Sequence, residues 1–413
     1  MITPADAGVF SSKIIGRSRP GVETIPPSRV ATLTVFINPR RTPLSRYPEA
    51  FRGILSLAAH ENARASIENW DGYEVTPLIR ADDLAVGMGL AALWIKDESQ
   101  RFGLGSFKAL GGAYGVARVV AEAGVPPANI TVACASDGNH GRAVAWGANR
   151  AGCRARVYLP SHVSRSRGEA IEAWGARVIR VEGEYDEAVA QAAADARSLG
   201  LTVVTDTAYS GEEEIPRTVM QGYTVMVEEA LEQIGADRPT HVFVQGGVGG
   251  LAASVIAHVW ERVGPPLPTV VVVEPEAADC LLASARQGRP TPSAGSLSTV
   301  MAGLSCRHVS TLAWPILERG VHGFMTVPDS AVFPTMRALA SGLAGTPVEG
   351  GESGVVGLVG LQVAASDPDL RSALGLNEGS RTLVFNTEGA TDPGLYRQVI
   401  EEDRGPCPTS QVG

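Results

Sequence analysis

The stretch His241-Val-Phe-Val-Gln-Gly-Gly-Val-Gly-Gly-Leu-Ala252 joins a short apolar run to a glycine-rich turn and the start of a helix. A strand ending in such a turn is typical of α/β proteins, in which ligands bind beyond the carboxyl ends of the strands. Backbone N–H groups at a helix N-terminus bind anions, so this turn is predicted to hold a phosphate. The predicted phosphate-binding residues are Gly246, Gly247, Val248, Gly249 and Gly250.

Two other interpretations of this turn stay open at this point. Gly247, Gly249 and Ala252 fit the spacing of a dinucleotide-binding fingerprint. Glu274 follows the next apolar run, where an acid that binds a ribose would stand. Alternatively, the glycines serve only the close packing of a helix against a strand.

Apolar, β-branched runs alternate with helical spacing along most of the chain after Leu93. Continuous apolar strands between helices indicate parallel sheets covered on both faces, so the sequence predicts an α/β fold. The predicted strands are 130–134, 155–158, 177–181, 201–204, 241–244, 269–273 and 381–385, and the predicted helices include 185–199 and 228–234.

These elements fall into two groups, which predicts two domains, each a largely parallel twisted sheet covered by helices. The predicted large domain comprises residues 51–112 and 216–413, and the predicted small α/β domain comprises residues 113–215. Residues 1–50 are rich in proline, serine, threonine and arginine. They are predicted to form an irregular arm, packed on the body of the protein or on a partner subunit.

Composition narrows the classes of partner. A formal net charge of −9 argues against nucleic acid, because phosphate backbones attract basic surfaces. No apolar run approaches the ~20 residues that cross a bilayer, so no membrane partner is expected. The opening residues 1–6 lack a basic segment followed by an apolar one, which favours a cytoplasmic protein. The five cysteines and seven histidines show no metal-ligand spacing, so no metal is expected.

Lys108 stands between Phe107 and a glycine-rich helix start in Arg101-Phe-Gly-Leu-Gly-Ser-Phe-Lys-Ala-Leu-Gly-Gly112. Burial disfavours the ammonium form of a lysine and exposes the amine lone pair that attacks an aldehyde. Lys108 is therefore a candidate Schiff-base nucleophile. Alternatively, it opens an amphipathic helix and points into water, as most lysines do.

Two further polar turns follow predicted strands. The stretch Ala135-Ser-Asp-Gly-Asn-His-Gly-Arg142 lies between a strand and a helix, which predicts either an anion-binding turn or an ordinary tight turn. Thr387, after the strand that ends at 385, is predicted to contact a ring nitrogen, with Asn386 as the alternative.

The order of these stretches resembles the tryptophan-synthase-β-like, or fold-type II, family of enzymes that use pyridoxal 5'-phosphate (PLP). The resemblance extends from about Trp70 to Asp392 and includes Met220-Gln-Gly-Tyr223 and Thr387-Glu-Gly389. Within the family, the pattern is most similar to the diaminopropionate ammonia-lyases. Asp137 is the most telling residue, because serine and threonine dehydratases of this fold usually carry Ser or Thr there.

The resemblance implies a PLP cofactor in the cleft between the domains and a role for each matching residue. Lys108 would bind PLP as a Schiff base and then remove the Cα proton of the substrate, while Gly246–Gly250 would hold the phosphate. Asn139 would contact the phenolic oxygen of the ring. Asp137 would act as a second acid or base. The small amino-acid substrate would lie against Ser136, Asp137 and His140.

The implied reaction is the α,β-elimination of 2,3-diaminopropionate to pyruvate and ammonia, by a cytoplasmic homodimer. Some residues depart from the lyase pattern. Ser106 before Phe107 is also the dehydratase form, Arg217-Thr218 replaces a tryptophan-containing pair, and Ala390 stands where an aspartate is common. The alternatives are a serine or threonine dehydratase, a β-replacement synthase, an NAD-dependent oxidoreductase, or a protein that binds PLP without catalysis.

Overall fold

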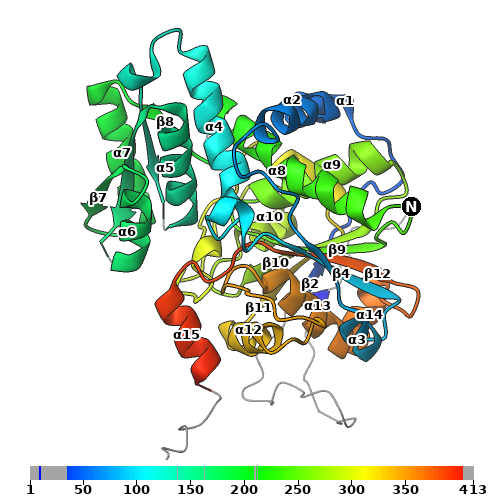
Figure 1. Cartoon of the computed structure of the whole chain (residues 1–413). Helices are drawn as coiled ribbons and strands as arrows, with labels where there is room; N and C mark the ends of the chain where they lie inside the picture. The colour runs from blue at the N-terminus through cyan, green and yellow to red at the C-terminus, as the bar shows by residue number, and fades with distance from the viewer. Residues whose placement is uncertain are drawn as a thin grey trace, which may run out of the picture.

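A computed structural model describes residues 9–10, 35–136, 138–161, 163–208, 211 and 213–402. Two β-sheets with helices around them form the fold (Figure 1). The strands are β1 (Val9–Phe10), β2 (Val35–Ile37), β3 (Leu78–Arg80), β4 (Ala92–Asp97), β5 (Thr131–Ala135), β6 (Arg154–Pro160), β7 (Arg177–Val181), β8 (Thr202–Val203), β9 (His241–Gln245), β10 (Thr269–Pro275), β11 (Gly323–Val327) and β12 (Arg381–Asn386).

The α-helices are α1 (Glu49–Arg52), α2 (Leu57–Ile67), α3 (Asp82–Gly87), α4 (Lys108–Glu122), α5 (Asn139–Ala151), α6 (Arg165–Glu172), α7 (Tyr185–Leu199), α8 (Glu214–Ile234), α9 (Gly250–Val263), α10 (Cys280–Gln287), α11 (Trp314–Gly320), α12 (Val332–Ala340), α13 (Val356–Ser366), α14 (Pro368–Leu374) and α15 (Pro393–Glu401). Short 3-10 helices are η1 (Arg101–Gly103), η2 (Pro127–Asn129), η3 (Ala302–Leu304) and η4 (Asp329–Ala331). No helix of the described residues is both long and apolar enough to cross a membrane.

The larger sheet has eight strands in the order β1-β2-β11-β10-β9-β12-β4-β3. Its five central strands, from β11 to β4, run parallel, and the outer strands β2 and β3 pair antiparallel with them. The smaller sheet, β7-β6-β5-β8, is parallel throughout. The predicted α/β fold class is therefore confirmed. The domain limits at 112/113 and 215/216 stay a prediction.

Helices cover both faces of the larger sheet. In Figure 1, α2, α8 and α9 lie on one side of it and α3, α12, α13 and α14 on the other, while α5, α6 and α7 surround the smaller sheet. Two apolar cores correspond to these two faces, one containing Val242 and Trp260 and the other Phe243 and Val359. Alternate residues of β9 thus enter opposite cores, which is why its three central residues, 242–244, are all apolar.

Residues 35–37 of the predicted N-terminal arm form a strand, β2, that packs on the body of the chain. β2 adds an antiparallel strand beside β11, with Phe36 opposite Phe324. The Asn38 side chain then donates hydrogen bonds to the carbonyls of Glu318 and Val321 at 2.8 and 2.9 Å. The prediction of an irregular arm was wrong for residues 35–37, because short apolar runs among prolines and arginines still complete a sheet edge.

A buried ion-pair network fixes the segment that leads to Lys108. The Arg101 side chain is 1% exposed and lies 2.8 Å from Glu98 Oε1 and 2.7 Å from Glu229 Oε2. Lys96 Nζ, fully buried in β4, lies 2.7 Å from the same oxygen of Glu229. Two cations thus face two carboxylates in the interior, where each partner offsets the desolvation cost of the other.

We expect Arg101→Ala to lower the free energy of unfolding by about 3–5 kcal/mol, because it leaves buried carboxylates without their cation. Urea titration followed by tryptophan fluorescence measures the loss. The matched control is Arg80→Ala, which breaks the exposed Arg80–Asp82 pair and should cost at most about 1 kcal/mol. Equal effects of the two substitutions would contradict a structural role for the network.

Candidate active site

One cavity lies where the loops after β5, β8, β9 and β12 meet the start of α4. With its opening to solvent it encloses about 1080 Å³. Loops of both sheets form its walls. This is expected where the carboxyl ends of parallel strands from two sheets face the same cleft. Lining residues include Phe107, Lys108, Ser136, Gly138, Asn139, His140, Arg167, Asp206, Thr207, Tyr223, Gly247, Val248, Gly249, Gly250, Cys306, Thr387 and Glu388.

Lys108 is the first residue of α4, and its ammonium group faces this cavity. Its Nζ lies 2.6 Å from Asp206 Oδ2. It also lies 5.3 and 5.8 Å from the ring centroids of Phe107 and Tyr223. The cation is therefore held by one carboxylate between two aromatic rings. The alternative, a lysine pointing into bulk water, was wrong.

The ion pair sets the charge of both groups. Burial on its own lowers the pKa of Lys108, but the adjacent Asp206 carboxylate outweighs it and raises the net pKa above the usual value. For Asp206, burial opposes ionisation, yet Lys108 and His140 lower the net pKa of its carboxyl group. The sequence-based argument that burial would favour a neutral amine was thus incomplete, because it lacked the aspartate.

The glycine-rich turn between β9 and α9 forms one wall. The backbone N–H groups of Gly247, Val248 and Gly249 donate no hydrogen bond to any residue that the structure describes, and all three residues line the cavity. Gly249 has φ +95°, and a Cβ there would lie 2.7 Å from Leu317. Unpaired N–H groups at the start of a helix suit a phosphate. Gly246 lies outside the cavity, since its N–H pairs with the Val273 carbonyl at 2.8 Å.

The turn after β5 forms the opposite wall. Ser136 Oγ accepts hydrogen bonds from the N–H groups of Gly138 and Gly141 at 3.0 and 2.8 Å, so its side chain holds the turn together. Asn139 begins α5, and its amide donates to Glu388 Oε2. His140 donates from Nε2 to the Val204 carbonyl at 2.9 Å if that nitrogen carries the proton. Burial lowers the pKa of His140, although Asp206 opposes the shift.

The loop after β12 distinguishes Thr387 from Asn386. Thr387 lines the cavity. The Asn386 amide instead donates to Asp97 Oδ1 and the Glu349 carbonyl, both at 2.9 Å. Of the two residues, only Thr387 thus has its side chain placed to meet a ligand in this cavity.

Sequence reasoning missed several cavity residues and proposed one that the structure does not describe. Asp137 lies outside the described residues. Asp206 was missed although it comes two residues after a predicted strand, where functional residues gather in α/β folds. Tyr223 stands in the stretch Met220–Tyr223 but carried no assigned role. Arg167 lies on α6, outside the quoted stretches, and Glu388 stands in the stretch Thr387–Gly389 but carried no assigned role.

Comparison with known proteins identifies the class. Residues 70–388 match the family described as pyridoxal-phosphate dependent enzymes. Because this match covers most of the chain, the protein belongs to that family and is an enzyme that uses PLP. The glycine-rich turn with its unpaired N–H groups and the lysine in the same cavity fit that cofactor.

Individual relatives indicate which kind of PLP enzyme the chain resembles. The chain is 37% identical to the diaminopropionate ammonia-lyase of Escherichia coli K12 over 371 residues, covering 85% of this chain and 93% of the relative. It is also 37% identical to the same enzyme from Salmonella typhimurium, covering 80% of this chain and 89% of that one. The crystal structure of the Escherichia coli enzyme with an aminoacrylate-PLP azomethine intermediate superposes with a TM-score of 0.82 at 35% identity, covering 90% of this chain and 97% of that one.

The alternative of an NAD-dependent oxidoreductase was wrong. Glu274 is fully buried, and its two oxygens accept the backbone N–H groups of Leu281 and Leu282, both at 2.8 Å. Its carboxyl group therefore caps the start of α10 instead of meeting a ribose. The glycine spacing that suggested a dinucleotide belongs to a PLP enzyme.

An acidic side chain beside the cavity is predicted to make stability depend on pH. Glu352 Oε1 lies 2.6 Å from Arg167 Nη2. Burial and Glu388 raise the pKa of Glu352 from 4.5 to about 7, although Arg167 opposes the shift. Because the folded pKa lies above the unfolded one, the stabilising contribution is present below pH 4.5 and is lost as pH rises through about 7.

We therefore expect Glu352→Gln to gain stability relative to wild type as the pH rises from about 5 to about 8, by an amount on the order of 1–3 kcal/mol. Thermal melts across this range measure the difference. The control is Glu378→Gln at an exposed position, whose difference from wild type should stay constant. A constant difference for Glu352→Gln as well would show that this carboxyl does not titrate there.

Proposed function

We propose that this enzyme catalyses the α,β-elimination of 2,3-diaminopropionate, giving pyruvate and ammonia. The observation that carries the proposal is the Lys108–Asp206 pair, 2.6 Å apart, in a cavity walled by the glycine-rich turn. The 37% identity to diaminopropionate ammonia-lyases over most of both chains supports the choice of substrate.

Four groups of residues would hold the cofactor. Lys108 would bind it covalently, and the N–H groups of Gly247–Gly250 would hold its phosphate. Asn139 would contact the phenolic oxygen, and Thr387 the pyridine nitrogen. When bound, PLP acts as an electron sink that acidifies the Cα–H of an amino acid. A neutral hydroxyl such as that of Thr387 would leave the ring nitrogen uncharged, so the ring would withdraw electrons less strongly. Weaker withdrawal favours prompt elimination over transamination.

Proton transfer falls to Lys108 and Asp206. Lys108 Nζ would first pass its own proton to Asp206 Oδ2, 2.6 Å away, and the free amine would then remove the Cα proton. The β-nitrogen of the substrate must be protonated before it leaves, because an amide ion is too basic to depart. An aspartate–lysine pair that shares protons within one cavity can both remove the Cα proton and protonate the β-nitrogen.

Asp137 is the proposed second acid or base. It removes the Cα proton of the D-isomer from the opposite side, or protonates the departing amine. In the sequence it stands between Ser136, which follows β5, and Gly138, which precedes Asn139. The substrate carboxylate would lie against the turn at Ser136–His140, whose last two N–H groups begin α5.

Two carboxylates of the lining suit a substrate with two amino groups. Asp206 and Glu388 both line the cavity, and anions near the second amine lower the cost of burying its charge. Serine and threonine carry a neutral hydroxyl at that position. The cavity thus favours diaminopropionate over the dehydratase substrates.

A substrate panel tests the proposal. Both isomers of diaminopropionate, serine, threonine and O-acetylserine are compared by keto-acid and ammonia release. We expect diaminopropionate to be the best substrate, with two molecules of ammonia per pyruvate, whereas serine yields one. Lys108→Ala should lose the activity and the borohydride-reduced pyridoxyl adduct on this peptide. Faster turnover of serine or threonine would instead identify a dehydratase.

The two aspartates are distinguished by substitution. Asp137→Asn and Asp206→Asn should each lower kcat by about 10²–10⁴-fold, since each removes a positioned acid or base. PLP should remain bound in both, as its visible absorbance reports. We expect Asp137→Asn to affect the two isomers of diaminopropionate unequally if it serves only one face of the substrate. Full activity of Asp137→Asn on both isomers would remove it from the mechanism.

Assembly and location remain predictions of this proposal. We expect a homodimer, which analytical ultracentrifugation of the holoenzyme would establish, and a cytoplasmic enzyme of amino-acid metabolism.

A further inference from the structure

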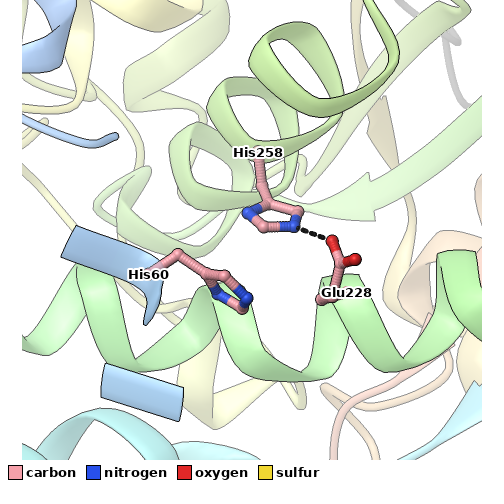
Figure 2. A group of neighbouring side chains, drawn as sticks. All are labelled: His60, Glu228 and His258. Atoms are coloured by element: carbon pink, nitrogen blue, oxygen red, sulfur yellow. Dashed lines mark hydrogen bonds and ion pairs between the residues drawn. The ribbon is translucent and has the colours of Figure 1, made fainter. Parts of the chain in front are cut away.

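Three ionisable side chains meet between helices behind the active site. His60 lies on α2, Glu228 on α8 and His258 on α9, and their residues are only 1%, 5% and 3% exposed. Each offers one donor atom such that all three atoms lie within 4.8 Å of one another. Figure 2 shows the His60 ring extending across α8 toward Glu228 and His258. None of the three lines the active-site cavity.

The hydrogen bonds of Thr224 determine which His60 nitrogen carries the proton. The Thr224 hydroxyl donates to the Gln221 carbonyl at 2.6 Å, so it accepts from His60 Nδ1 at 2.9 Å. Nε2 of His60 therefore carries a lone pair.

That lone pair has no partner among the residues that the structure describes, although Nε2 is buried. An unpaired polar atom in the interior costs about 1–3 kcal/mol. His258 does not satisfy it, because the two rings are tilted by 59° with centroids 4.4 Å apart and no hydrogen bond joins them. A cation between the rings would supply the missing partner.

The other two side chains are already oriented as ligands. His258 Nε2 lies 2.5 Å from Glu228 Oε2, a hydrogen bond drawn in Figure 2. Arg262 Nε donates to the second oxygen, Oε1, at 3.0 Å. Metal-binding histidines and carboxylates are typically held in this way by outer hydrogen bonds; here Arg262 donates to Glu228 and the Thr224 hydroxyl accepts from His60.

We propose that His60, Glu228 and His258 bind one divalent transition-metal ion of the zinc class. Two imidazole nitrogens and one carboxylate oxygen form a donor set that Zn²⁺ prefers, with water in the fourth position. The metal takes the place of the proton that His258 Nε2 shares with Glu228. Bonds of ~2.0–2.2 Å place tetrahedral donors ~3.3–3.5 Å apart. His258 Nε2 and Glu228 Oε2, which are 2.5 Å apart, would therefore separate by about 1 Å to admit the ion.

The position of the site indicates a structural role. It joins α2 to α8, which carries Tyr223 in the active-site wall, and to α9, which begins at the glycine-rich turn. The Arg262 side chain is 53% exposed and covers Glu228 on the solvent side. Movement of this arginine opens a path for the ion without disturbing the helices.

Metal content of the purified holoenzyme tests the proposal. After dialysis against a chelator, the protein is incubated with Zn²⁺, passed through a desalting column and analysed by elemental mass spectrometry. We expect one zinc per chain and a higher melting temperature with zinc. His60→Asn should abolish both, because its amide keeps the donor to Thr224 and removes Nε2. His258→Gln and Glu228→Gln should do the same, while the exposed His308→Gln should match wild type.

The visible absorbance of bound PLP shows that each variant is folded, independently of any lyase activity. His60→Asn tests the site even if Glu228→Gln fails to fold, because it leaves the Glu228–Arg262 and Glu228–His258 contacts in place. Absence of zinc from wild type, or equal zinc in wild type and His60→Asn, would overturn the proposal. Neither result bears on the substrate assigned above.

Discussion

The ion pair between Lys108 and Asp206 is the interaction on which the active site depends. Lys108 begins α4, which leads away from the larger sheet, and Asp206 follows β8 of the smaller sheet. Their contact therefore exists only when the two sheets come together with the correct geometry. Opposite charges in a partly dehydrated cavity attract strongly, and each lowers the cost of burying the other. In the proposed mechanism, the same contact would place the reactive amine beside its proton partner.

Sequence alone predicted most of the fold, and its failures have physical causes. The valine-rich strands β9 and β10 were evident because both faces of each are buried. β4 escaped prediction because Lys96 and Asp97 end it, and a buried lysine cannot be anticipated before its partner Glu229 is known. β11, Gly-Phe-Met-Thr-Val, begins with glycine and contains methionine, which are poor signals of a strand.

Some active-site residues could likewise be predicted from the sequence, whereas others could not. Gly247, Asn139 and Thr387 were predicted because each stands in a turn directly after a strand, and each lines the cavity. Glu388 and Arg167 are far apart in sequence, and only the tertiary structure brings both to the lining of the cavity. The cluster of His60, Glu228 and His258 has no motif spacing, since its members come from three separate helices. Spacing along the chain therefore does not predict a metal, and the proposed site depends on the packing of α2 against α8 and α9.

The pairing of strands has a consequence for how the chain folds during synthesis. Strands β5 to β8 are contiguous in sequence, so the smaller sheet is complete once residue 203 has been made. In the larger sheet, β4 pairs with β12, with Ala92 opposite Arg381. Such distant pairing is slow because a long loop must close first. We therefore expect the apolar face of β4 to emerge from the ribosome long before its partner, which makes this segment a natural client for chaperones.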